Sequence, residues 1–176
     1  ISNYGIWSWG DEIVAAFTLG YMGDDNFHRR DRSQPFTTLQ ARSRDGGHTW
    51  SCTPMSCASP GGRALSADEH QIEALQIAPL LKDDADGLLP SCPENLDFTH
   101  TNFALFCARS GLGGGTLSWF YTSIDRASSW QGPYRMDDFG LPGVSARTDY
   151  LVQGPHEALL FLTAAKSDGR EGRPFC

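Results

Sequence analysis

The sequence predicts an all-β fold, and three observations support this class. The 176 residues include 19 Gly and 10 Pro, a composition typical of a chain with many tight turns. Short runs of aromatic and β-branched residues are bounded by glycine, as strands of antiparallel sheets are. A turn sequence that begins at Ser43 returns in a weaker form at Ser123. We therefore expect one antiparallel unit to be repeated along the chain.

The first turn sequence, residues 43–50, follows the pattern Ser-x-Asp-x-Gly-x-Thr-Trp. Asp45 can accept hydrogen bonds from backbone N–H groups and so close a tight turn. Gly46 and Gly47 adopt backbone angles that other residues reach only at a cost. The last two positions supply a short hydroxyl and a large ring to bury. Every position therefore has a structural task, and we expect no catalytic role for Asp45.

The second turn sequence, residues 123–130, keeps Ser, Asp and Trp but has Ala127 in place of Gly and Ser129 in place of Thr. The two copies begin 80 positions apart, at Ser43 and Ser123. One repeat of a four-stranded unit takes about 40–50 residues. An insertion, residues 53–95, is therefore expected between the first and second units.

Strands are predicted around both turns by their apolar and β-branched content. The expected strands are residues 13–19, 37–42, 103–108, 117–122, 147–153, 157–164 and 173–176. Within the insertion, residues 70–81 suit either a short helix or an edge strand. Residues 83–87 are acidic and are expected to form a solvated turn, since they lack the ligands of a calcium loop.

Composition excludes several classes of function. The net charge is −7, and no basic cluster is large enough to follow a phosphate backbone, so nucleic acid is not an expected partner. No apolar run reaches the roughly 20 residues of a membrane span. The five cysteines match no zinc spacing, and no metal or cofactor is expected. Cys52 and Cys57 are close enough to pair, but free thiols remain an equal alternative.

The turn sequence resembles the Asp-box of β-propellers in the sialidase (neuraminidase) superfamily, and the wider pattern is similar to bacterial sialidase-like proteins. The residues that carry this resemblance lie along most of the chain: Trp7-Ser8-Trp9, Glu12, Phe17, Tyr21, His28, Asp31, residues 43–50, residues 97–100, residues 129–134 and residues 146–151.

The resemblance implies about three blades of a six-bladed β-propeller. Residues 1–52 would form one blade, 96–135 a second, and 145–176 an incomplete third. The remaining blades would come from the same polypeptide, since the chain begins at Ile1 and is expected to be a piece of a longer protein. An Asp-box joins the third and fourth strands of a blade, on the face opposite the active site, so Asp125 is also expected to be structural.

The resemblance also implies an exo-acting glycoside hydrolase that removes a terminal sugar, with sialic acid as one candidate, in a secreted or periplasmic bacterial protein. Sialidases hold the substrate carboxylate with three arginines and use a Tyr nucleophile with an Asp as acid/base. This sequence lacks the Phe/Tyr-Arg-Ile-Pro segment that marks the first of those arginines. Either that segment lies elsewhere in the protein, or the protein acts on a different glycan.

Three places on the expected site face hold candidate residues. The loop 23–35 contains His28, Arg30 and Asp31, which either bind an anionic sugar or form a self-neutralising solvated loop. Arg147 and Asp149 fall on the same side of a strand by alternation, as a substrate clamp or an internal salt bridge.

The third place, residues 97–100, leads into the expected inner strand of the second unit. Here Asp97 is the candidate general acid and His100 a substrate ligand, against the alternative of a turn before a strand. Asp97, Asp31 and His28 are thus the catalytic candidates, and Arg147, Asp149, Arg30 and His100 would bind substrate. Two other functions stay open: a non-catalytic carbohydrate-binding propeller, and a protein-interaction propeller with an apolar face.

Overall fold

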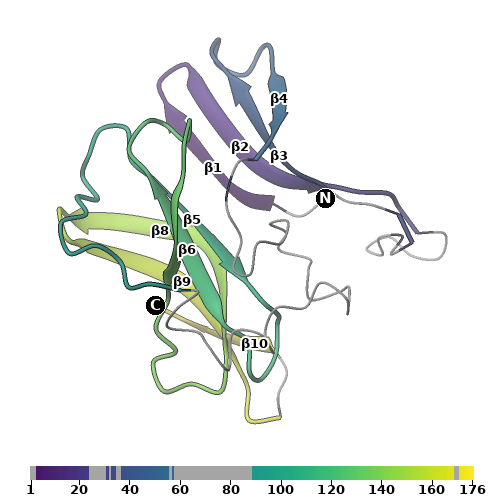
Figure 1. Ribbon diagram of the computed structural model, residues 1–176, viewed down its shortest axis with the longest axis vertical. Coiled ribbons are helices and arrows are strands. Elements are labelled where there is room, and N and C mark those ends of the chain that lie inside the picture. The colour runs from purple at the N-terminus through teal and green to yellow at the C-terminus, as the bar shows by residue number, and fades with distance from the viewer. Residues whose placement is uncertain are drawn as a thin grey trace.

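Strands are the only regular elements in the part of the protein that the structure describes, and the predicted all-β class is confirmed (Figure 1). This computed structural model describes residues 3–23, 31, 33–34, 37–55, 57, 89–168 and 171–176. Among these residues no helix is long and apolar enough to span a membrane. The segments 70–81 and 83–87 lie outside the described residues.

The ten strands of this part form three small antiparallel sheets in chain order. The first sheet has the order β1 (Asn3–Trp9), β2 (Glu12–Leu19), β3 (Thr37–Ser43) and β4 (Ser51–Pro54). The second has β5 (Ala104–Arg109), β6 (Ser118–Ser123) and β7 (Gln131–Arg135). The third has β8 (Val144–Gly154), β9 (Glu157–Ala165) and β10 (Glu171–Phe175).

All seven predicted strands are present with ends shifted by at most three residues. Three further strands, β1, β4 and β7, were not predicted. Residues 97–100 form no strand: the described chain passes through turns before β5 begins at Ala104, which is the predicted alternative of a turn before a strand. The Asp97 carboxylate accepts hydrogen bonds from the Thr99 N–H at 2.8 Å and the Thr99 hydroxyl at 2.6 Å. Such a local turn competes with strand pairing for the same backbone.

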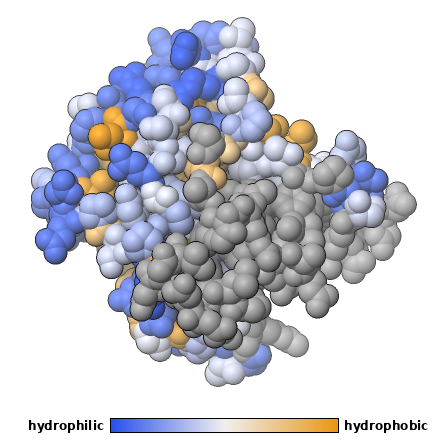
Figure 2. Space-filling model, in the orientation of Figure 1, coloured by the Kyte–Doolittle hydropathy of each residue, from blue (hydrophilic) through white to orange (hydrophobic). Residues whose placement is uncertain are grey.

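The second sheet lies between the other two and is covered on both faces. All six residues of β5 are buried, as expected for the continuous apolar run Ala-Leu-Phe-Cys-Ala. One core forms between the first and second sheets, around Trp7, Phe106 and Trp119. A second core, around Leu105, Val144 and Leu162, joins the second and third sheets. Figure 2 shows that hydrophobic residues on the described part of one face form only small separate patches.

The turn between β3 and β4 has the predicted hydrogen bonds. Asp45 Oδ1 accepts the Thr49 N–H at 2.8 Å, and Asp45 Oδ2 accepts the Thr49 hydroxyl at 2.6 Å. The Ser43 hydroxyl oxygen accepts the Gly47 N–H at 2.8 Å. A carboxylate and a hydroxyl thereby satisfy backbone donors that have no ladder partner. Hydrogen bonds from side chains within the turn therefore fix its conformation.

The turn between β6 and β7 repeats this scheme with different residues. Asp125 accepts hydrogen bonds from the Ser129 N–H at 2.9 Å and the Ser129 hydroxyl at 2.6 Å. Arg126 and Ala127 have φ angles of 57° and 58°, a region that favours glycine. Arg126 forms a salt bridge with Glu12 at 3.0 Å, and Ala127 is fully buried. These tertiary contacts hold two non-glycine residues in a costly conformation.

Candidate functional site

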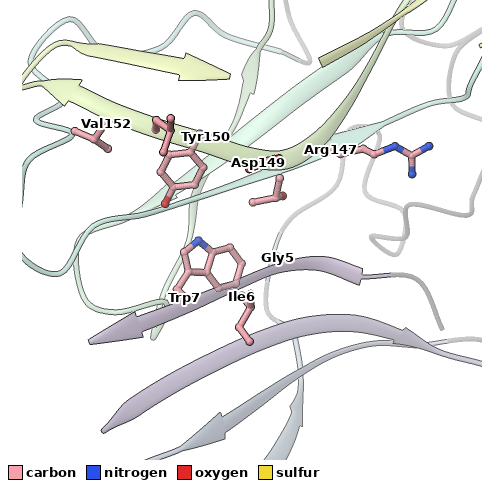
Figure 3. A pocket seen from close by; sticks show the side chains of 9 residues that line it. Gly5, Ile6, Trp7, Arg147, Asp149, Tyr150 and Val152 are labelled. Carbon is pink, nitrogen blue, oxygen red and sulfur yellow. The ribbon is translucent and has the colours of Figure 1, made fainter. Parts of the chain in front are cut away.

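A groove of about 470 Å³ is lined by residues of β1 and β8, among them two of the predicted site residues (Figure 3). Its lining comes from Gly5, Ile6 and Trp7 on β1 and from residues 147–152 on β8. Figure 3 shows the Trp7 indole and the Tyr150 ring directed towards each other, while the Arg147 side chain extends away from them along β8. The groove thus has an aromatic part and a charged part.

A β-bulge in β8 presents the charged residues. Ala146 pairs with Leu162 and Tyr150 with Leu160, so residues 147–149 of β8 face the single residue Phe161 of β9. Bulges of this kind redirect side chains and are frequent beside functional sites. Arg147 and Asp149 are both exposed, and Thr148 between them is half-buried. Exposure therefore alternates along these three residues, and all three line the groove.

The opposite side of β8 is fixed to the second sheet by hydrogen bonds. The Ser118 hydroxyl donates to the Val144 carbonyl at 2.6 Å and accepts the Ala146 N–H at 2.9 Å. The buried Arg109 Nη1 donates to the Ala146 carbonyl at 3.2 Å. Arg109 was not predicted as a site residue, because nothing in the run of apolar residues before it indicates that it turns inward. It places a buried cation next to the backbone of Arg147.

The Tyr150 hydroxyl faces the backbone of β5. It accepts a hydrogen bond from the Leu105 N–H at 3.1 Å. Burial raises the pKa of Tyr150, and the hydrogen bond from Leu105 offsets only part of that effect. A phenol with a raised pKa stays protonated at neutral pH, which does not suit a nucleophile. The structure therefore gives Tyr150 a packing role.

Asp97 and His100 do not line the groove that contains Arg147. The Phe98 N–H donates to the Pro155 carbonyl at 2.8 Å, so this segment contacts the turn after β8. Asp149 precedes Pro155 by six residues, which corresponds to roughly 20 Å of extended strand. Hydrogen bonds from the Thr99 hydroxyl and N–H lower the pKa of Asp97. The lowered pKa keeps this carboxylate ionised at neutral pH, which suits the predicted alternative of a turn-closing Asp.

His100 closes the same turn as Asp97. Its Nδ1 accepts the Asn102 N–H at 3.2 Å, and its carbonyl accepts the Phe103 N–H at 2.9 Å. Asn102 in turn accepts a hydrogen bond from Arg126 Nε at 2.8 Å, which ties this segment to the β6–β7 turn. The structure thus brings His100 to the end of the sheets that holds the Asp45 and Asp125 turns, and away from the groove.

Asp31 lies after the end of β2, where its N–H donates to the Tyr21 carbonyl at 2.9 Å. The Ser33 hydroxyl and N–H donate to the Asp31 carboxylate at 2.6 and 2.9 Å and lower its pKa. This carboxylate is ionised at neutral pH and so cannot act there as a proton donor. The other two candidates of this loop, His28 and Arg30, lie outside the described residues.

The thiols and acidic groups of the described part form no metal-binding cluster of three or more His, Cys, Asp or Glu. All five cysteines are free, including Cys52 and Cys57. We found no protein-family model that matches the chain and no similar sequence among curated proteins.

Proposed function

We propose that the protein is part of a sialidase-like β-propeller in which the three sheets are successive blades. Two turns with the same hydrogen-bond scheme support this proposal, because each joins the last two strands of its sheet. The face-to-face packing of the three sheets also fits the proposal. Further blades would close the ring, since open sheet faces and edges otherwise remain.

We propose that the groove between β1 and β8 binds an acidic sugar and that the protein is a sialidase-like glycoside hydrolase. The bulge at residues 147–149 is the observation that carries this proposal. A guanidinium such as that of Arg147 matches a carboxylate in charge and in its two-donor geometry. The Asp149 carboxylate can accept hydrogen bonds from sugar hydroxyls beside it. Such a glycan substrate would be met outside the cytoplasm, in a secreted or periplasmic protein.

The candidate acid/base residues lie in different parts of the described structure. Asp149 is the carboxylate that lines the groove among the described residues. Asp31 lies at the end of the first sheet opposite the β3–β4 turn, and its lowered pKa keeps it in the ionised form that a base needs. His28 and Arg30 are predicted to contact the substrate or its proton, and Asp97, which closes a turn, is the remaining candidate acid.

A second function, a non-catalytic carbohydrate-binding propeller, is favoured by one observation. Hydrogen bonds lower the pKa of both predicted acid/base carboxylates of the described part, Asp31 and Asp97. The Asp that serves a sialidase as acid/base must donate a proton, which a carboxylate with a lowered pKa does not hold at neutral pH. A protein that only binds the sugar needs Arg147 and hydroxyl ligands but no such acid.

One experiment distinguishes the two functions. The protein, Arg147→Ala and the control Arg173→Ala, an exposed arginine of β10, are assayed on fluorogenic glycosides that include a sialoside. The same three proteins are titrated with N-acetylneuraminic acid and its methyl ester. Turnover that Arg147→Ala alone abolishes supports the hydrolase. Binding of the acid over the ester without turnover supports the binding propeller, and neither activity nor binding would contradict both.

A further inference from the structure

At the β5 edge of the second sheet, backbone groups form hydrogen bonds with side chains instead of with a neighbouring strand. The Leu105 N–H donates to the Tyr150 hydroxyl at 3.1 Å, and the Leu105 carbonyl accepts the Trp7 indole N–H at 3.2 Å. The Cys107 N–H donates to the Thr148 hydroxyl at 2.8 Å. Leu105 and Cys107 are 2% and 3% exposed, so these backbone groups need protein partners. Three side chains from β1 and β8 therefore supply the hydrogen-bond partners that β1 supplies to β2 in the first sheet.

Thr148 has a second property, because it is the middle residue of the β8 bulge. Residues 147–149 have only Phe161 opposite them on β9, so the β8–β9 ladder does not fix all three. The Thr148 hydroxyl supplies the missing attachment, on β5 instead of β9. Successive side chains of a strand point to opposite sides, so anchoring Thr148 inward directs its two neighbours outward.

The packing around Thr148 is also tight. A Cβ added at Gly5 on β1 would lie 2.9 Å from Thr148 Cγ2 and 2.8 Å from the Trp7 ring. The methyl group of Thr148 therefore contacts β1 while its hydroxyl contacts β5. With both branches of the side chain occupied, its χ1 rotamer is held.

We propose that Thr148 is a positioning residue that sets the direction of Arg147 and Asp149 in the groove through its hydrogen bond from Cys107. The identity of the ligand in this proposal rests on the function proposed above, whereas the anchoring of the bulge is independent of that function. The hydroxyl carries the effect, because it alone pairs with the Cys107 N–H.

The first test measures the anchoring without any ligand. Thr148→Val keeps the shape and removes the acceptor, Thr148→Ser keeps the hydroxyl, and Thr163→Val on β9 is the control. Thr148→Ala replaces Thr148→Val where the latter does not fold. We expect amide hydrogen exchange at Cys107 to rise at least tenfold more in Thr148→Val than exchange at amides that open only on global unfolding, and the NMR amide signals of Arg147 and Asp149 to shift. Thr148→Ser and Thr163→Val should retain the exchange rate and the signals of the unmodified protein.

Unchanged exchange at Cys107 in Thr148→Val, or the same change in Thr148→Ser, would overturn the proposal, since the hydroxyl would then not hold the bulge. The second test is the affinity for N-acetylneuraminic acid. We expect Thr148→Val to weaken binding at least tenfold and Thr148→Ser to restore it. Full affinity in Thr148→Val would also overturn the positioning role. If the unmodified protein does not bind the sugar, the proposed function fails, while the exchange and NMR results still decide the role of Thr148.

Discussion

At the scale of single residues, Asp45 shows how a local turn becomes a pH-dependent contribution to stability. Hydrogen bonds from the Thr49 hydroxyl and N–H, and then from Ser43, lower the pKa of Asp45 from 3.8 to about 2. The pKa is lower in the folded state, so the unfolded chain takes up the proton first as the pH falls. The stabilisation is therefore complete above pH 3.8 and is lost as the pH falls through about 2.

We predict that Asp45→Asn removes this part of the acid sensitivity, because an amide does not titrate. The melting temperature of the variant should fall less steeply than that of the unmodified protein between pH 3.8 and about 2. Thermal unfolding followed by circular dichroism at several pH values measures this slope. Glu157→Gln, at an exposed carboxylate of β9, should keep the original slope. Equal slopes for all three proteins would contradict the prediction.

The same turn predicts a cost for a side chain at Gly47. Its φ is +93°, and a Cβ there would meet atoms no closer than 3.7 Å, so backbone conformation alone decides the effect. We expect Gly47→Ala to lower the free energy of unfolding by about 1 kcal/mol. Urea denaturation of both proteins measures this difference in the free energy of unfolding.

Gly154→Ala provides the matched control for this substitution. Gly154 is not among the glycines of positive φ, and its Cβ would lie 3.8 Å from Glu157 Cβ. This variant should be neutral or slightly more stable, because alanine restricts the unfolded chain. Equal losses at the two positions would show that backbone angle is not the cause at Gly47.

At the scale of elements, Glu12 joins the first and second sheets. Its carboxylate pairs with Arg42 of β3 and with Arg126 of the β6–β7 turn, the latter at 3.0 Å. The hydrogen bond from Arg126 lowers the pKa of Glu12, burial opposes this, and Arg42 adds to the lowering. Arg42 also donates to the Arg126 carbonyl at 2.8 Å. One carboxylate thus orients two guanidinium groups from two sheets.

We predict that Glu12→Gln destabilises the protein by about 1–3 kcal/mol, because two partly buried arginines lose their counter-charge. Asp11→Asn, next in sequence and exposed, should have little effect. Urea denaturation of Glu12→Gln, Arg126→Ala and the double variant gives the coupling energy between the two residues. Additive losses would contradict a direct interaction.

The elements also show which parts of the fold were predictable. Strands β5 and β9 follow from continuous apolar runs, and the Asp45 turn follows from its own side chains. Strand β1 was missed because Trp7 and Trp9 lie in a run with little β-branched content, and because contacts such as the Trp7–Leu105 hydrogen bond join it to distant residues. The turn at Asp97 was one of two alternatives left open by the sequence, and the hydrogen bonds from Thr99 to the Asp97 carboxylate form it.

At the scale of the whole molecule, the reactivity of the buried cysteines can be used to follow global unfolding. Burial raises the pKa of Cys107 and of Cys57 to about 12. The thiolate is the reactive form, so both thiols should react slowly at neutral pH, whereas Cys52 and Cys176 are exposed.

We predict that iodoacetamide labels Cys52 and Cys176 of the native protein at neutral pH and leaves Cys107 unlabelled. Cys107 should become labelled only as urea unfolds the sheets, because β5 is covered on both faces. Peptide mass spectrometry across a urea series measures both. Labelling of Cys107 well below the unfolding midpoint would show that the second sheet opens locally.

The sequence by itself determined the all-β class, most of the strands and the closed turn at Asp45, because these depend on alternation, turn residues and hydrogen bonds within a few positions. It also placed Arg147 and Asp149 on one side of a strand. Only the tertiary structure decided that a bulge places them in a groove and that Asp97 lies outside it. It also decided that Thr148 and Tyr150 accept hydrogen bonds from backbone N–H groups of β5. These outcomes depend on contacts such as the Trp7–Leu105 hydrogen bond, whose partners are 98 positions apart. A local pattern contains no information about partners at that separation, since packing of the sheets selects them.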